Sequence, residues 1–303
     1  MVEDFRIGFW NTGCPANYEN NIFGCSSSGF ATSEKWVETK DEKVAYWEHK
    51  LKGETITGSY KTVIDSLSNL SFAPKFCLGF FNKAIGLEDF ISRYGQEMPY
   101  VPIIGGGAAR ADEQSLGELI PQADDVALLA VSEGNFAFQS LNIYKQLGVA
   151  VEIIRTSDRE FELLRVLPGG EWQNALEFYR AQQMLYGIDP GNFELMTFCD
   201  SSGRNIHSST DGQILKTGAN LPANNILHLS ITTYPSAEKA LASFMTDDNS
   251  LIFGCAGIRS LINKPLKSGK NSLTGFMFGE LVTLNGQAMF GNLMLAKIIK
   301  LNN

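Results

Sequence analysis

The apolar runs of this chain have the length of β-strands, and this limits the fold more than any other feature. The clearest runs, at 76–81 and 126–131, hold six residues each, whereas a helix that crosses a bilayer needs about 20 apolar residues. Between them, residues 86–98 carry apolar side chains at helical spacing, and the next apolar run leads into three glycines. This order of strand, helix and strand indicates an α/β fold.

The same alternation continues towards the end of the sequence. Strand-like runs at 226–232 and 250–257 flank a helical pattern at 236–245, and two closing runs are joined near Asn285 and Gly286. The last connection is too short for a crossover, so we expect these two runs to pair in antiparallel fashion. The prediction is therefore an α/β fold in which mixed β-sheets are layered with helices.

A turn at Pro168, Gly169 and Gly170 precedes a further helical pattern, and we place a domain boundary there. The two predicted regions are residues 1–172 and residues 173–303. We expect them to form one compact body.

Charge and cysteine content narrow the class of function. The chain has 25 basic and 33 acidic residues and a net charge of −8, which argues against nucleic-acid binding because phosphate contacts need a basic surface. No run is long enough for membrane insertion, and the N-terminus lacks the basic start and apolar stretch of a signal peptide. The five cysteines lack zinc-site spacing, so we expect reduced thiols and a cytoplasmic protein.

A first turn, from Gly24 to Gly29, presents the Cys25 thiol and three consecutive hydroxyls, Ser26–Ser28. It resembles a nucleophile elbow, but the G-x-S-x-G pattern would need glycine at position 28. A nucleophilic thiol or hydroxyl also needs a nearby base, and the sequence shows no local partner. Cys25 is therefore either a nucleophile or a small apolar core residue, and the second interpretation is the default.

A second turn, Gly105–Gly107 followed by Arg110, ends another apolar run. Glycines let a ligand approach backbone N–H groups, and a guanidinium can bind a carboxylate or a phosphate. The dinucleotide fingerprint fails because its third glycine would fall at Arg110, and the phosphate loop G-K-[ST] is missing. Two interpretations remain, an anion or ligand loop and a tight turn packed against a helix.

A third turn contains Cys255 and is followed by Arg259, while Glu280 follows a later apolar strand. Arg259 and Glu280 form a structural ion pair in one interpretation. In the other they line a pocket and bind the charged ends of a small zwitterion.

The three histidines, His49, His207 and His228, are not clustered, and no carboxylate pair has the spacing of a metal site. His228 lies in an alternating apolar run and is expected to be a hydrogen-bonded structural residue. We predict no metal.

In sequence order, several motifs resemble those of the FIST family, a two-part sensory module with an N-terminal and a C-terminal region. The motifs are IFGCSSSGFAT, VPIIGGGAARADE, LPGGEWQNALEFYRAQ, LPANNILHLSIT, SLIFGCAGIR and GFMFGELVTLNGQ. The chain departs from the family pattern at Phe30, where an acid often follows the first turn, and at Phe290–Leu293 in place of a His-Asn-Gln-Thr-like ending. These departures indicate a different ligand or a different mode of binding.

The resemblance implies two related FIST-like regions, residues 1–172 and 173–303, in a stand-alone cytoplasmic sensor. Some family members are reported to bind haem, whose axial ligand here would be one of the histidines or cysteines. No motif selects one of them, so no cofactor is predicted and haem stays an alternative. A homodimer or a separate signalling protein is the expected partner.

The leading hypothesis is a sensor that holds a small anionic or zwitterionic metabolite in a cleft between the two regions, without turnover. The predicted ligand-binding residues are Gly24, Cys25, Ser26, Ser27, Gly105, Gly106, Gly107, Arg110, Cys255, Arg259 and Glu280. The alternatives are an enzyme that uses Cys25, Cys255 or a serine of Ser26–Ser28 as nucleophile, a haem-binding gas sensor, and a protein-interaction module.

Overall fold

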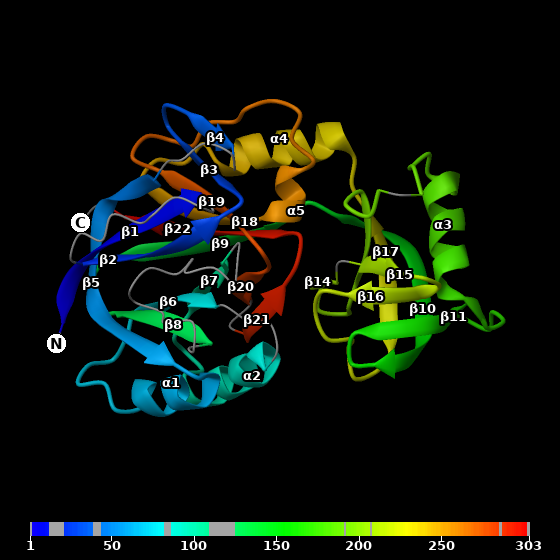
Figure 1. Cartoon of the computed structure of the whole chain (residues 1–303), viewed down its shortest axis with the longest axis horizontal. Coiled ribbons are helices and arrows are strands. Elements are labelled where there is room, and N and C mark those ends of the chain that lie inside the picture. Colours follow the sequence, from blue (N-terminus) through cyan, green and yellow to red (C-terminus); the bar gives the residue numbers. More distant parts are fainter. Residues whose placement is uncertain are drawn as a thin grey trace.

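The computed structural model describes most of the chain and contains three β-sheets and five helices within the described residues (Figure 1). The described residues are 2–11, 21–38, 44–81, 86–108, 125–190, 192–206, 208–284 and 287–301. Most of the regular structure is strand. No helix in these ranges is long and apolar enough to span a membrane.

Sheet A has eight strands in the order β2, β1, β5, β8, β6, β7, β20 and β21. Two neighbouring pairs, β1 with β2 and β6 with β7, are parallel, and the other pairs are antiparallel. Helices α1 (Tyr60–Leu67) and α2 (Leu87–Glu97) cover one face of this sheet. The strand bounds are β1 Glu3–Asn11, β2 Ile22–Ser27, β5 Val44–Gly58, β6 Phe76–Phe81, β7 Ile103–Gly107, β8 Val126–Val131, β20 Glu280–Leu284 and β21 Gln287–Gly291.

Sheet B has six strands in the order β4, β3, β19, β18, β22 and β9, of which only β18 and β19 are parallel neighbours. Helices α4 (Tyr234–Phe244) and α5 (Ala256–Arg259) lie on its outer side (Figure 1). The bounds are β3 Gly29–Thr32, β4 Trp36–Glu38, β9 Phe136–Asn142, β18 Ser250–Cys255, β19 Leu273–Met277 and β22 Met294–Lys300.

Sheets A and B pack face to face around an aromatic core. The Phe9 ring lies edge-on to Phe80 and to Phe253, with centroid distances of 6.1 Å and 5.7 Å. These three rings come from both sheets, and all three are fully buried. Edge-to-face rings of this kind stabilise a core beyond the area that they bury. We call sheets A and B, with α1, α2, α4 and α5, the sandwich.

Sheet C forms a separate lobe, residues 145–231, beside the sandwich (Figure 1). All of its strand pairs are antiparallel, in the order β14, β13, β17, β10, β11, β16 and β15, and β12 pairs with β11. The chain enters the lobe from β9 and leaves it into α4, so the lobe is an insertion within sheet B. The bounds are β10 Lys145–Ser157, β11 Glu160–Val166, β12 Gln173–Asn174, β13 Met196–Cys199, β14 Asn205–Ile206, β15 Ser208–Asp211, β16 Ile214–Thr217 and β17 Ile226–Ile231.

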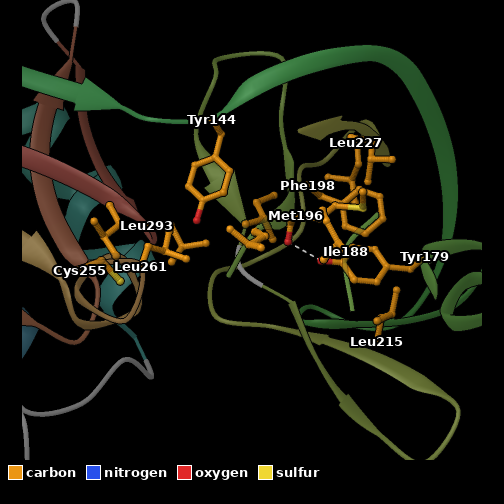
Figure 2. Packing of buried hydrophobic residues seen from close by; sticks show 14 of the residues in the cluster. Tyr144, Tyr179, Ile188, Met196, Phe198, Leu215, Leu227, Cys255, Leu261 and Leu293 are labelled. Carbon is orange, nitrogen blue, oxygen red and sulfur yellow. Dashed lines mark hydrogen bonds between the residues drawn. The ribbon is translucent and has the colours of Figure 1, made fainter. Parts of the chain in front are cut away.

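Helix α3 (Ala175–Leu185) covers sheet C, and its sequence shows why it forms there. Asn174 caps the helix, since its Oδ1 accepts hydrogen bonds from the N–H groups of Leu176 and Glu177, both at 3.0 Å. The buried face includes Tyr179, whose hydroxyl donates to the Met196 carbonyl of β13 (Figure 2). The cap and the buried face together hold α3 on the sheet.

The lobe and the sandwich share one hydrophobic cluster. Tyr144 lies between the core of the lobe and the side chains of Cys255, Leu261 and Leu293 of the sandwich (Figure 2). Its hydroxyl donates to the Glu194 carbonyl at 2.5 Å. Because apolar contact continues from one part to the other, the two are packed into a single body.

The predicted layering of mixed sheets with helices is confirmed. The predicted boundary at residue 172 lies between β11 and β12, which pair with each other through Leu163 and Asn174. Sheets A and B each contain strands from both sides of that boundary. Strand pairing thus divides the chain into a sandwich and an inserted lobe, and the division into residues 1–172 and 173–303 stays a prediction.

Candidate functional site

The ends of four strands meet at one edge of the sandwich. At the ends of the parallel strands β18 and β19, Cys255 lies opposite Met277. A methyl group placed on Gly106, near the end of β7, would lie 3.0 Å from Met277 Sδ. The N–H of Ser28, just after β2, donates to the Phe276 carbonyl at 2.7 Å. Since ligands of α/β proteins bind beyond the carboxyl ends of parallel strands, this is the candidate site.

We call this region the strand-end site. It contains every predicted ligand-binding residue that the structure describes, except Gly24 and Gly105. These two glycines lie further from the carboxyl ends of their strands. Arg110 and His207 lie outside the described residues. The residues that form the site are Cys25, Ser26, Ser27, Ser28, Gly29, Gly106, Gly107, Cys255, Ala256, Gly257, Arg259, Met277, Phe278, Gly279 and Glu280.

Glycines in and next to the site let strands approach one another. A methyl group on Gly105 would lie 1.8 Å from the Gly79 carbonyl oxygen, and one on Gly24 would lie 2.0 Å from that of Gly8. The N–H of Gly107 donates to the Gly279 carbonyl at 3.1 Å, so this amide is not available to a ligand. The geometry therefore supports the tight-packing interpretation of the second turn rather than the anion-loop interpretation, with β20 as the neighbour in place of a helix.

Both cysteines of the site are buried. Cys25 lies in the core between sheets A and B, and burial raises the pKa of its thiol well above the usual value. Burial likewise raises the pKa of the Cys255 thiol, and the Glu280 carboxyl beside it raises that pKa further. A nucleophilic cysteine needs a lowered pKa, so this geometry opposes the use of either thiol as nucleophile.

Glu280 has an unusual environment for a carboxyl group. The side chain is fully buried, and its Oε2 accepts a hydrogen bond from the Met294 N–H at 3.3 Å. Its Oε1 has no hydrogen-bond partner among the described residues. Burial raises the pKa of Glu280 well above its usual value, and hydrogen bonds from Met294 and Cys255 offset only part of this.

Arg259 does not neutralise Glu280. The Arg259 guanidinium lies over the Trp36 ring, 5.7 Å from its centroid, and next to Gly29. A methyl group on Gly29 would lie 2.9 Å from Arg259 Nε. Arg259 thus links the third turn to the first, and the predicted ion pair between Arg259 and Glu280 is not formed.

The serine turn also carries buried oxygens without partners. Ser26 Oγ and Ser28 Oγ are buried and have no hydrogen-bond partner within the described part of the chain, whereas Ser27 Oγ lies 3.5 Å from the Trp10 carbonyl. Each buried polar group left without a hydrogen bond costs about 1–3 kcal/mol. Two hydroxyls and one carboxyl oxygen in this condition therefore call for an explanation.

Phe278 was not predicted as a site residue. Its side chain is 51% exposed, although the residues on either side of it, Met277 and Gly279, are buried. The sequence signal is the GFMFGE segment, in which an aromatic residue stands at the last position before a glycine. Phe278 lies two residues before Glu280, and small-molecule sites combine aromatic side chains with a few polar groups.

The described histidines lie elsewhere. His49 lies on β5 of sheet A, and its Nε2 is 3.0 Å from Asn249 Oδ1. His228, on β17 of the lobe, lies opposite Cys199 of the neighbouring strand β13. In the described ranges no three His, Cys, Asp or Glu side chains are grouped so that they could hold a metal ion. No described histidine is therefore placed to ligate haem at the strand-end site.

No family model matches the chain, and no curated protein matches it in sequence. The FIST resemblance stays a prediction. The site is therefore interpreted from its own geometry.

Proposed function

We propose that the chain is a small-molecule sensor module of FIST type, which binds a small zwitterionic or anionic metabolite at the strand-end site. One observation carries the proposal: buried oxygens of Ser26, Ser28 and Glu280 without partners lie where four strand ends converge. A ligand that hydrogen-bonds to these oxygens offsets the cost of leaving them unsatisfied.

The chemistry of Glu280 favours a ligand with an ammonium group. In the ligand-free protein the raised pKa keeps this carboxyl protonated over a wider pH range. A bound ammonium would favour the ionised form, so the ligand would gain a charge-assisted hydrogen bond at Oε1. A zwitterion then places its carboxylate towards the serine hydroxyls, on the side of the site where Arg259 lies.

Phe278 completes the site as an apolar cover. Phe278 directly follows β19, and its ring is half-exposed. Gly279 is the next residue in the sequence, and Glu280 comes after it. Contact with a ring excludes water from a polar ligand and strengthens its hydrogen bonds. The proposed ligand therefore lies between Phe278 and the buried oxygens.

Binding without turnover is the form of activity that we propose. The two thiols of the site are held protonated by burial, so they lack the reactivity of catalytic cysteines. A sensor of this kind acts in the cytoplasm through a second copy of itself or through a separate signalling protein. This part of the proposal follows the family resemblance.

A thermal-shift screen of amino acids and dicarboxylic acids tests the proposal. A ligand at 100 times its Kd stabilises the protein by about 2.7 kcal/mol, which raises the Tm measurably. We expect an amino acid or related zwitterion to do so, and we expect Glu280→Gln to weaken its binding about tenfold in calorimetric titration.

Glu162→Gln is the matched control, because Glu162 is exposed on β11 in the lobe and the substitution makes the same change from a carboxyl to an amide. It should leave the affinity unchanged. A screen in which no compound raises the Tm contradicts the proposal, and so does equal binding by the Glu280→Gln variant and the wild type.

A further inference from the structure

A groove lined by lysines lies at the other end of the sandwich from the strand-end site. It has a volume of about 870 Å³ and is bordered by Lys50 and Lys52 of β5, Lys75 before β6, and Lys300 at the end of β22. Phe136 and His49 also border it. Lys75 precedes the start of β6, whereas the strand-end site lies beyond the carboxyl end of β7, which runs parallel to β6. We call this cavity the lysine groove.

The lysines outnumber the acids around the groove. Four lysines line it against Asp4 and Glu133, in a chain whose net charge is −8. Only Lys52 is paired, with Glu133 Oε1 at 3.3 Å. Lys50, Lys75 and Lys300 form no ion pair within the described residues. Three of the four lysines that line the groove thus have no ion-pair partner among the described residues.

Strand pairing adds to this concentration of positive charge. Lys50 is the register partner of Arg6 on the adjacent strand β1, so two cations lie directly opposite each other. Like charges opposite each other across a strand pair are destabilising. A second cavity, of about 560 Å³, adjoins the groove at this point, since Asp4, Lys50 and Lys52 line both and Arg6 lines the second.

Backbone hydrogen bonds order the main chain at three of the four lysines. The N–H of Lys75 donates to the Val131 carbonyl at 2.7 Å, and that of Lys300 donates to the Asn249 carbonyl at 3.1 Å. The Lys52 carbonyl accepts from the Ser132 N–H at 2.9 Å. The cations therefore come from strands of both sheets, β5 and β22, and from the residue before β6, and not from one loop.

We propose that the lysine groove binds a small polyanion that carries at least two phosphate groups. Lysine ammonium groups bind phosphate as compact point charges, and separate lysines suit a ligand with several charged groups. The volume lies in the range of small-molecule sites. The net negative charge of the chain disfavours a long nucleic acid, which would meet acidic surface beyond the groove.

Calorimetric titration with inorganic pyrophosphate at constant ionic strength tests this proposal. We expect saturable binding by the wild type and weaker binding of orthophosphate, which offers fewer charges. The double variant Lys75→Gln/Lys300→Gln removes two unpaired charges and keeps a polar side chain that is one heavy atom shorter at each position. It should raise the Kd for pyrophosphate about tenfold or more.

The control is the double variant Lys61→Gln/Lys239→Gln, which removes two exposed lysines from α1 and α4 and has the same net charge. It should change the Kd less than about twofold, because screening weakens distant exposed charges. Unfolding curves of both variants check that the fold is intact.

Three results would overturn the proposal. They are no binding of pyrophosphate by the wild type, an equal loss of affinity in both double variants, and displacement of pyrophosphate by duplex DNA at equal phosphate concentration. The ligand of the strand-end site should bind normally to Lys75→Gln/Lys300→Gln, so this test is independent of the proposed sensor function.

Discussion

Two charged side chains, Arg204, which is partly buried, and Glu280, which is fully buried, lie in opposite situations. The Arg204 side chain donates to Asp200 at 2.8 Å, to Glu88 at 3.3 Å and to the Asn220 carbonyl at 2.9 Å. Glu88 in turn accepts from the Asn220 N–H. Glu280, by contrast, has one oxygen bonded to the Met294 N–H and the other without a partner among the described residues.

The difference separates a group whose charge is satisfied within the fold from one that a ligand would complete under the proposed function. Arg204 links Asp200 and Asn220 of the lobe to Glu88 on α2 of the sandwich, and every charge in this cluster is paired. Such a cluster fixes the orientation of the two parts. A carboxyl that stays half-satisfied lowers stability, and a protein keeps such a group where a ligand completes it.

The largest effect is expected for Arg204→Ala. The substitution leaves Glu88 and Asp200 as partly buried carboxylates without a cation, which should lower the free energy of unfolding by about 3 kcal/mol in urea titration. Arg93→Ala is the control, since Arg93 pairs with Asp65 at 3.1 Å on an exposed surface. It should cost less than about 1 kcal/mol. Equal costs for the two variants would contradict the structural role of the Arg204 cluster.

The second prediction concerns the pH dependence of stability in Glu280→Gln. The pKa of Glu280 is raised in the folded state, so its contribution to stability is complete below its unfolded pKa near 4.5 and decreases as the pH rises towards the folded pKa. The wild type should therefore lose stability relative to Glu280→Gln over this interval, by at most about 1.4 kcal/mol per pH unit.

Urea unfolding of both proteins between pH 4.5 and 8 measures this difference. Glu162→Gln, at an exposed position, should run parallel to the wild type. A constant difference between Glu280→Gln and the wild type would show that Glu280 does not have a raised pKa.

Local sequence patterns were sufficient to predict the elements and the layering. The runs at 76–81 and 126–131 are β6 and β8, which are buried on both faces and therefore read as continuous apolar runs. The helical pattern at 86–98 is α2, whose one buried face sets its periodicity. The pairing of strands was not predictable in the same way. Strand β3 pairs with β19, 240 residues further along the chain, and no local signal selects such a partner. For the same reason the inserted lobe was not predicted.

The candidate site shows the same limit. The motifs did identify turns that meet, as the contacts of Ser28, Gly106 and Cys255 show. Their chemistry depends on burial, which one sequence does not reveal. Glu280 and Arg259 were expected to act together, yet one is enclosed beside Cys255 and the other lies on Trp36. The sequence also did not indicate that Phe278 is exposed, because this residue directly follows the largely apolar strand β19.

The third prediction concerns Tyr144, which lies between the lobe and the sandwich. Tyr144→Phe removes the hydroxyl that donates to the Glu194 carbonyl and keeps the ring between Cys255 and the lobe. We expect a loss of about 1 kcal/mol in the free energy of unfolding. Tyr100→Phe should cause no change, since Tyr100 is 95% exposed. A loss above about 3 kcal/mol would mean that the hydroxyl holds the lobe in place.

The smallest effect on stability is expected for Phe278→Ala, and it tests the functional side of the comparison. Because the ring is half-exposed, its removal should change the free energy of unfolding by less than about 0.5 kcal/mol. Affinity for the ligand found by screening should nevertheless fall, since the ring covers the proposed site. Tyr100→Ala removes an almost fully exposed aromatic ring far along the chain and should leave both quantities unchanged. A Phe278→Ala variant that binds as tightly as the wild type would move the ligand away from the end of β19, and the unpaired oxygens of Glu280 and Ser28 would then need another explanation.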